Sequence, residues 1–338
     1  MKKVTKIYSN DDLLFLVDLE ITRRCNLRCI FCSVVDNSSP IILFQSINKL
    51  LEKLSMITDK KLFLWVTGGE PLLVNYAWHI RDLLSRNINV GLIGMNTNGT
   101  LINELQKAEI LVLNYDIISV SIDGPRDLHN IIRGKKIYEA TINGLKNLLK
   151  AKTKVGTNTQ IVVNTVLTKI SLDSIKEFFD FLIDLGVDGI KFTPMFYDKT
   201  TELYQKYGLE PSDAKKLEHL YWYLKRKNKL VPWFSKSLLH NCMNYIRDIP
   251  SEPEFCGCGR YFIFVSADGY IYPCYRIRSK KLASIHLSEI ISGTLNHNAL
   301  IERITQIRNK KRSSCMYCSH VYNLYLNDVM AQRNEENR

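Results

Sequence analysis

Three cysteines fall within eight residues near the start of the chain, at Cys25, Cys29 and Cys32, with the spacing C-x3-C-x2-C. A mostly apolar run from Leu13 to Ile21 leads directly into them, and such a run is typical of a buried parallel strand. The cysteines are therefore expected on the loop at the carboxyl end of that strand. Three thiolates this close can hold three corners of an iron–sulfur cube and leave one iron open. Zinc sites usually combine two separate cysteine pairs instead.

The cysteine run, with Phe31 just before its last member, resembles the cluster motif of the radical S-adenosylmethionine (SAM) superfamily. The resemblance implies that Cys25, Cys29 and Cys32 bind a [4Fe-4S] cluster whose open iron chelates SAM, and it places Phe31 with the cofactor-binding residues. It also implies reductive cleavage of SAM to methionine and a 5′-deoxyadenosyl radical. The alternative is that the three cysteines are merely buried or bind zinc.

Short apolar runs alternate with longer amphipathic stretches from Leu13 to about Pro194. Six such βα repeats predict an α/β fold, in which right-handed crossovers curl a parallel sheet into a partial (β/α)6 TIM-like barrel. The expected strands are Leu14–Ile21, Lys61–Val66, Val90–Asn96, Ile117–Ile122, Gln160–Leu167 and Gly189–Thr193. The expected helices between them include Ser46–Met56, Tyr76–Arg86, Ile102–Ala108, Tyr138–Leu149 and Leu172–Leu185.

Functional residues of such barrels gather at the carboxyl ends of the strands, and the second expected strand ends in Gly68-Gly69-Glu70-Pro71. Two glycines let backbone groups approach a ligand closely, and Glu70 offers an acceptor. The stretch matches the Gly-Gly-Glu-Pro motif that binds the SAM amino group in the radical SAM superfamily, so the resemblance assigns Gly68, Gly69, Glu70 and Pro71 to SAM. Taken alone, the same residues could form an ordinary strand-to-helix turn.

The fourth expected strand runs into Ser121-Ile122-Asp123-Gly124-Pro125, with Arg133 shortly after. This stretch resembles the Ser-x-Asp-Gly-Pro segment of peptide- and sulfatase-modifying radical SAM enzymes, which implies that Ser121 and Arg133 contact the SAM carboxylate and ribose. A guanidinium is physically suited to bidentate carboxylate binding. For Asp123, capping of the next helix is the favoured role, with substrate contact as the alternative.

Two further residues are candidates for cofactor contacts. Asn164 lies late in the fifth expected strand, and Met195 follows the sixth. In the radical SAM superfamily an apolar residue at the sixth strand commonly packs on adenine, which implies that role for Met195. Packing in the protein core is the alternative for Met195.

The pattern changes after residue 197, and we expect a helical bridge at 198–250 and a cysteine-rich α+β domain at 251–338, behind a radical SAM core at 1–197. Asp268-Gly269 marks a hairpin turn between two apolar runs. The last segment resembles the SPASM and twitch auxiliary-cluster domains, and its length favours the twitch form with one auxiliary [4Fe-4S] cluster. The resemblance implies the ligands Cys256, Cys274, Cys315 and Cys318. Cys258 is the rival to Cys256, and a four-cysteine zinc site is the alternative.

Composition limits which partners, cellular locations and cysteine roles remain to be considered. The net charge of +12 admits nucleic acid, an acidic peptide or an anionic small molecule as partner, but the basic residues are spread along the chain, as on a solvated surface. No apolar run is long enough for a transmembrane helix or a signal peptide, which predicts a cytoplasmic protein without a membrane partner. In a reducing compartment, nine cysteines favour metal binding or catalysis over disulfides.

Three functions stay open at this point. The first is a radical SAM enzyme of oxidoreductase or isomerase type that modifies a ribosomally made peptide by epimerisation or cross-linking, with flavodoxin or ferredoxin as electron donor. Only 24 residues precede Cys25, so a winged-helix leader-binding module does not fit there. The second is a dehydrogenase or epimerase for an aminocyclitol or aminoglycoside. The third is a non-enzymatic metal protein that binds nucleic acid or another protein, which needs a basic and aromatic stripe that the sequence does not show.

Cys242 lies in the expected bridge, outside both cysteine sets. A buried thiol is usually a small apolar side chain. A radical epimerase, however, needs a hydrogen-atom donor opposite the 5′-deoxyadenosyl radical, and a thiol S–H bond is weak enough to serve. Cys242, or else Cys258, is our candidate donor, and a bridge between domains is a place where a substrate cleft can form.

Overall fold

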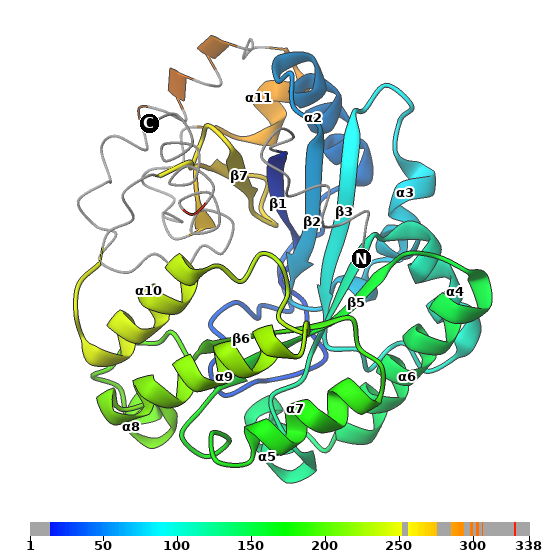
Figure 1. The fold of residues 1–338 in the computed structure, drawn as a ribbon. Coiled ribbons are helices and arrows are strands. Elements are labelled where there is room, and N and C mark those ends of the chain that lie inside the picture. The colour runs from blue at the N-terminus through cyan, green and yellow to red at the C-terminus, as the bar shows by residue number, and fades with distance from the viewer. Residues whose placement is uncertain are drawn as a thin grey trace, which may run out of the picture.

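A single mixed sheet organises the structure, a computed structural model that describes residues 14–251, 256–275, 285–293, 298–299, 302–303, 306 and 328. Its strands are β1 (Phe15–Thr22), β2 (Leu62–Gly68), β3 (Val90–Thr97), β4 (Ile117–Ser121), β5 (Gln160–Leu167), β6 (Gly189–Pro194), β7 (Phe262–Val265) and β8 (Ile271–Tyr272). They follow the order β6-β5-β4-β3-β2-β1-β7-β8 (Figure 1). The strands β1 to β6 are parallel to their neighbours, which confirms the expected α/β fold with a partial six-stranded barrel.

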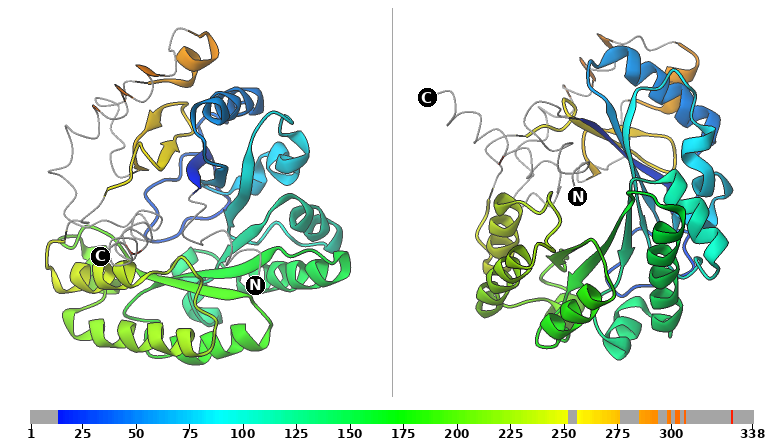
Figure 2. Two further views of the ribbon diagram at one scale, coloured as in Figure 1. Left: turned by 45° about the horizontal axis from the view of Figure 1, so that its top comes forward. Right: turned by 45° about the vertical axis from the view of Figure 1, so that its right-hand side comes forward.

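Helices of the repeats lie along one face of the curved sheet (Figure 2). They are α2 (Phe44–Ile57), α3 (Ile80–Leu83), α4 (Leu105–Asn114), α5 (Arg126–Arg133), α6 (Tyr138–Val155) and α7 (Ile175–Asp184). Short 3-10 helices, η1 (Pro71–Leu73) and η2 (Asn75–His79), precede α3. Each helix returns the chain to the start of the next parallel strand, so all six carboxyl ends meet at one edge of the sheet.

Strand residues alternate between the helix-covered face and the opposite, inner face of the barrel. On β1, Val17 and Leu19 are completely buried in the apolar core, and Asp18 between them points to the inner face. On β6, Ile190 and Phe192 are likewise core residues, and Lys191 takes the inner face. The apolar core therefore lies between sheet and helices, and the inner face carries polar side chains.

The expected strands agree with the observed ones to within about two residues, but one expected helix is wrong. The stretch Tyr76–Arg86 forms only η2 and α3. In a continuous α-helix the amide of Arg81 would donate to the carbonyl of Ala77, but both groups are bonded to other parts of the chain. The hydroxyl of Tyr115 donates to the carbonyl of Ala77 at 2.5 Å, and the amide of Arg81 donates to Oδ1 of Asn114 at 3.0 Å. The expected Ile102–Ala108 helix is also displaced, since α4 begins at Leu105 and continues through the buried Leu111.

Beyond β6 the chain is helical over the stretch expected as a bridge. It forms α8 (Glu202–Tyr207), a 3-10 turn η3 (Pro211–Asp213), α9 (Ala214–Arg226) and α10 (Lys236–Arg247). After them β7 pairs in parallel with β1, and β8 turns back on β7 across the Asp268-Gly269 turn, where Gly269 has φ +82°. The C-terminal region thus extends the barrel sheet directly. The domain limits at 197 and 250 stay predictions.

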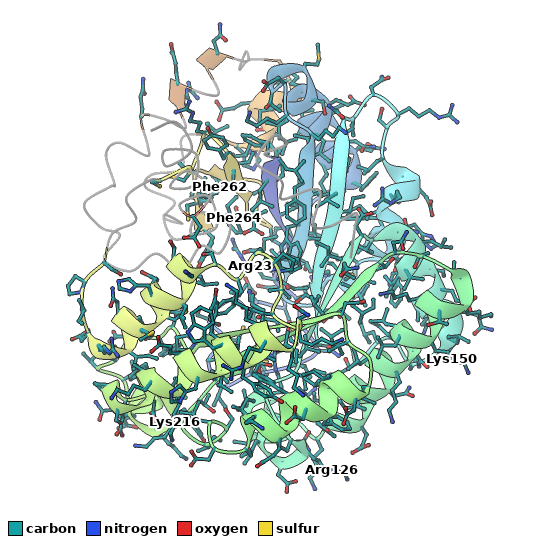
Figure 3. All side chains as sticks on the ribbon, viewed as in Figure 1. Arg23, Arg126, Lys150, Lys216, Phe262 and Phe264 are labelled. Carbon is teal, nitrogen blue, oxygen red and sulfur yellow. The ribbon has the colours of Figure 1, made fainter. Side chains whose placement is uncertain are left out.

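Charged side chains occupy two kinds of place in the fold. Arg126, Lys150 and Lys216 project from the outer rim, whereas Arg23 lies in the middle of the view (Figure 3). Arg23 binds Glu20 at 2.5 Å and Asp268 of the hairpin turn at 3.3 Å.

The described helices include none that is both long and apolar enough to cross a membrane. The last helix described is α11 (Leu287–Ile291).

Candidate functional site

The loop that carries Cys25, Cys29 and Cys32 follows β1, as expected, and packs against the Gly-Gly-Glu-Pro turn after β2. The amides of Gly69 and Glu70 donate to the carbonyls of Thr22 and Arg24, each at 2.9 Å. A Cβ on Gly68 would lie 2.1 Å from the Thr22 oxygen, and one on Gly69 would lie 2.2 Å from the Arg24 oxygen. The two glycines are therefore required where the turn meets the cysteine loop.

The end of β3 and the C-terminal end of α5 hold the same loop. Asn26 donates to Thr100 at 2.9 Å and accepts from Asn98 at 2.8 Å, so its side chain joins the cysteine loop to the end of β3. Gly134, which has φ +74° after α5, would place a Cβ only 2.2 Å from the carbonyl oxygen of Arg28. Glycine is needed there for both its backbone conformation and its close approach. Contacts from the ends of β2 and β3 and from the C-terminal end of α5 thus fix the path of the cysteine loop.

Glu70 lies completely buried, and its carboxylate is bonded within the protein. It accepts hydrogen bonds from the hydroxyl of Thr97 at 2.8 Å and from the amides of Asn98 and Leu72 at 2.7 and 3.1 Å. Burial raises the pKa of Glu70 to about 6, although these hydrogen bonds favour its ionised form. The side chain holds the turn to the end of β3. A contact of Gly68, Gly69, Glu70 and Pro71 with SAM stays a prediction.

The three cysteines differ in exposure along their loop. Cys25 is buried, Cys29 is intermediate and Cys32 is exposed. Burial raises the pKa of Cys25 to about 11, so binding of a metal there must displace a proton. Among the described residues, no three histidine, cysteine or carboxylate side chains converge closely enough for a metal ion. Ligands of a four-iron cube each bind a different iron, so three thiols spread over one loop suit a cluster better than a single zinc ion.

Arg133 lies against this loop from α5, but its main partner is a carboxylate of the protein. Its Nε and Nη2 bind both oxygens of the fully buried Asp123, at 2.5 and 2.9 Å, and its Nη1 lies 3.8 Å from the sulfur of Cys29. The guanidinium also lies 5.6 Å from the ring centre of Phe31. The guanidinium has further N–H groups besides those that bind Asp123. The contact of Arg133 with SAM therefore stays a prediction.

The favoured capping role of Asp123 was wrong. Pro125 occupies the N-cap position of α5, and no side chain caps that helix. Besides Arg133, the Asp123 carboxylate accepts the amide of Val166 at 2.9 Å, so it joins the end of β4 to β5. The backbone amide of Asp123 lies 3.2 Å from Nδ1 of the buried His129, and burial lowers the pKa of that histidine to about 4. Asp123 is a structural partner of Arg133.

The remaining predicted cofactor residues lie on β4, β5 and just after β6. Ser121 is directly opposite Asn164 in the sheet register, and both lie on the inner face. The Oδ1 atom of Asn164 is buried without a hydrogen-bond partner among the described residues. An unpaired buried acceptor costs free energy unless a ligand supplies the donor, so this position fits a bound cofactor. Met195 is buried in the apolar core, where it can also serve packing alone.

Cys242 is buried in α10, and burial raises the pKa of its thiol to about 12. Lys191 of β6 is close enough to oppose that shift electrostatically. The thiol therefore stays protonated near neutral pH and lies next to a residue of the inner face.

Of the predicted auxiliary ligands, Cys256 and Cys274 lie within the described residues, and Cys315 and Cys318 lie outside them. The sulfurs of Cys256 and its rival Cys258 are 3.2 Å apart, with Cys258 the more deeply buried. The choice between these two ligands and the second cluster itself stay predictions.

Sequence reasoning did not assign a role to Asn26, Asn98 or Gly134, which hold the cysteine loop, nor to the inner-face residues Asp18 and Lys191. One signal was available. Asp18 and Lys191 are charged residues within apolar strand runs, and a charge there is expensive to bury without a function.

The family comparison agrees with this geometry. Residues 19–182, which run from β1 into α7, match the profile of the radical SAM superfamily. The chain is 28% identical over 306 residues to a probable GTP 3′,8-cyclase of Sulfurisphaera tokodaii, covering 85% of this chain and 88% of that protein. It is 24% identical over 309 residues to a cysteine-type anaerobic sulfatase-maturating enzyme of Clostridium novyi, covering 81% of this chain and 78% of that enzyme.

A solved structure with the same fold is native anSMEcpe with bound AdoMet and Kp18Cys peptide. Its TM-score is 0.66 at 17% identity, over 95% of this chain and 99% of that chain. The likeness in fold therefore reaches past residue 182 into the C-terminal region. The cysteine loop, the contacts that support it and the matched profile together identify residues 19–182 as a radical SAM domain.

Proposed function

We propose that the chain is a radical SAM enzyme that modifies a peptide, with Cys25, Cys29 and Cys32 as ligands of its [4Fe-4S] cluster. The observation that carries the proposal is the convergence of the ends of β2, β3 and α5 on the cysteine loop, beside Arg133 and the Gly-Gly-Glu-Pro turn. When bound by these thiols, such a cluster would supply the electron for reductive cleavage of SAM and, through it, the radical chemistry that removes hydrogen from the substrate. The fixed loop holds the thiols in place before the cluster binds, which lowers the cost of assembling the site.

The protein's own residues support the cofactors in distinct ways. Arg133 donates toward the sulfur of Cys29, and such outer contacts tune a cluster ligand. Ser121, the last residue of β4, and Asn164, in the middle of β5, face the inside of the barrel, where Oδ1 of Asn164 can accept a hydrogen bond from SAM. Phe31 and Met195 supply apolar surface.

The peptide substrate is supported by the relatives. A sulfatase-maturating enzyme aligns over 81% of the chain, and the fold of anSMEcpe is known with a bound peptide. A small-molecule substrate is the second candidate, because a probable GTP 3′,8-cyclase aligns over 85% of the chain. We further propose a cytoplasmic location and a flavodoxin or ferredoxin as electron donor.

Anaerobic reconstitution with iron and sulfide, followed by reduction in the presence of SAM, tests the central proposal. The wild-type protein should form 5′-deoxyadenosine, and the Cys25→Ala/Cys29→Ala/Cys32→Ala variant should form none while losing about half its iron, if two four-iron clusters are present. Undiminished 5′-deoxyadenosine from that variant would refute the assignment of the three cysteines.

The second cluster is proposed at Cys256, Cys274, Cys315 and Cys318, where four thiolates close every iron and favour electron transfer or structural support. Replacing Cys315 and Cys318 by alanine should lower iron content and leave SAM cleavage at the first cluster measurable. Stoichiometric zinc with a single cluster in the anaerobically purified wild type is the contrary result.

For the outcome of the reaction we propose epimerisation, with Cys242 as hydrogen donor. Its S–H hydrogen would pass to the substrate carbon radical, and the sulfur radical left behind would take one electron from the flavodoxin or ferredoxin and a proton from water. In D2O the inverted carbon should gain one deuterium. Cys242→Ala should still form 5′-deoxyadenosine but no inverted product, and an unchanged rate of inversion in that variant would exclude the role.

A further inference from the structure

Two charged side chains face the inside of the barrel from strands that lie far apart in the sheet order. Asp18 is on β1 and Lys191 is on β6, with four strands between them. The charge of each residue contributes to the pKa shift of the other, yet the two side chains do not form an ion pair. The carboxylate and the ammonium are therefore separate groups on the inner face of the barrel.

Neither group has a partner within the part of the chain that the structure describes. Oδ1 of Asp18 is buried and accepts no hydrogen bond, and Lys191 makes no hydrogen bond or ion pair. Burial raises the pKa of Asp18 to about 7, with Glu20 adding to the shift, and burial lowers the pKa of Lys191 to about 8. Both residues are half-buried, with Oδ1 of Asp18 itself buried. Charges taken out of water without partners cost free energy, and a ligand that pairs with both groups would recover that cost.

The surroundings place the pair next to the proposed cofactor. Lys191 is opposite Asn164 in the sheet register, and Asn164 is opposite Ser121, so one polar row crosses β4, β5 and β6. Asp18 lies in register between Trp65 of β2 and Phe264 of β7. Asp18, an acceptor between two aromatic residues, thus lies across the barrel from the donor Lys191. Lys191 in turn adjoins Asn164, one of the residues proposed to contact SAM.

We propose that Asp18 and Lys191 bind one amide group of the substrate, the carboxylate accepting from its N–H and the ammonium donating to its C=O. An amide carries a donor and an acceptor on opposite sides of one planar unit, which matches a lone acceptor facing a lone donor. The aromatic residues beside Asp18 suit the carbon atoms next to that amide. This inference rests on the proposed function and specifies which part of a peptide the barrel holds.

Equilibrium dialysis of the reconstituted protein with SAM, without reductant, tests it. The probes are a pool of random pentapeptides acetylated and amidated at their ends, a mixture of free amino acids, and glucosamine, each quantified by mass spectrometry. The wild-type protein should retain the capped peptides above the other two. Asp18→Asn and Lys191→Met should each lower that retention about tenfold, as expected for a lost hydrogen bond to a charged group. Lys191→Arg should keep more of it than Lys191→Met.

The matched control is Lys169→Met, which removes an exposed lysine bound to Glu210 and should retain peptides as the wild type does. Equal retention by the wild type, Asp18→Asn and Lys191→Met overturns the inference, and so does preferential retention of free amino acids or glucosamine. A variant counts only if it still forms 5′-deoxyadenosine after reduction. Absence of 5′-deoxyadenosine from the wild type would instead contradict the proposed function, so the two failures are distinguishable.

Discussion

Two acid–base sets in this barrel have the same chemistry and opposite arrangements. Asp123 and Arg133 meet in a bidentate ion pair at 2.5 and 2.9 Å, and a backbone amide completes the carboxylate. Asp18 and Lys191 also lie inside the protein, but they do not reach each other, and Oδ1 of Asp18 accepts nothing among the described residues. The first set is complete in the protein alone, and the second needs another molecule.

The difference separates structural from ligand-directed charge. A paired buried carboxylate is costly to disturb, because removal of one partner leaves the other uncompensated. An unpaired carboxylate pays its desolvation cost in the folded protein without compensation. Its removal should therefore raise the free energy of unfolding and weaken only ligand binding. Substitutions in the two sets should therefore change stability in opposite directions.

The largest expected effect comes from Asp123→Asn. The buried Arg133 guanidinium would lose its counter-charge, and breaking a buried pair costs about 3–5 kcal/mol. Urea unfolding of the cluster-free protein measures the loss. Asp173→Asn, which breaks an exposed pair with Lys216, is the control and should cost less than about 1 kcal/mol. Equal losses in the two variants would contradict the distinction.

Arg133→Lys should have a smaller effect, because it keeps the positive charge and removes the fork that binds both oxygens of Asp123. Loss of one charge-assisted hydrogen bond predicts a decrease of about 1.5–3 kcal/mol in the free energy of unfolding. The contact with Cys29 would also change, so the reduction potential of the reconstituted cluster should shift. An unaltered potential with the full stability loss would confine Arg133 to a structural role.

Asp18→Asn should stabilise the protein, and the gain should depend on pH. The folded-state pKa of Asp18, about 7, lies above the ordinary value near 3.9, so the folded protein holds a proton that the unfolded chain has lost between these values. Wild-type stability therefore falls as pH rises through this window. The variant escapes that fall and should be more stable by about 1–2 kcal/mol at pH 8 and nearly unchanged at pH 4, after the cost of burying its amide.

Unfolding curves at both pH values measure this gain, with the exposed Asp36→Asn as control. Burial raises the pKa of Asp18, whereas hydrogen bonds from Ser38 lower the pKa of Asp36. The control should therefore show no gain at pH 8. A variant of Asp18 that is destabilised at pH 8 would show that its carboxylate is as well paired as that of Asp123.

The strands and the cysteine loop were predictable from the sequence, because apolar runs fix parallel strands and the cysteine spacing is local. Helix η2 was not, since Tyr115, far along the chain, takes the carbonyl of Ala77 that a longer helix would use. The partner of Arg133 was missed for a similar reason. The sequence places Asp123 before Gly-Pro, as a helix cap would be, and only the fold brings the guanidinium to it.

The glycines show the same limit within a correctly identified motif. Their small size was expected to serve a ligand, and the structure shows Gly68 and Gly69 against the carbonyl oxygens of Thr22 and Arg24. The two adjacent glycines indicate that another group packs closely against the backbone. They do not indicate whether that group belongs to a ligand or to the protein. Likewise, a charge in an apolar run, as at Asp18 or Lys191, signals a special site without naming its partner.

The smallest expected effect is the coupling between Asp18 and Lys191. In a double-mutant cycle with Asp18→Asn and Lys191→Met, two groups beyond ion-pair distance should couple by less than about 1 kcal/mol, whereas residues in contact couple by about 0.5–3. The cycle with Asp123→Asn and Arg133→Met should lie at the upper end of that range, because each single variant leaves a buried charge behind. Urea unfolding of the wild type and the six variants at about pH 7.5 supplies both values. Strong coupling of Asp18 with Lys191 in the ligand-free protein would mean that they form a pair of their own, and the amide site proposed between them would be closed.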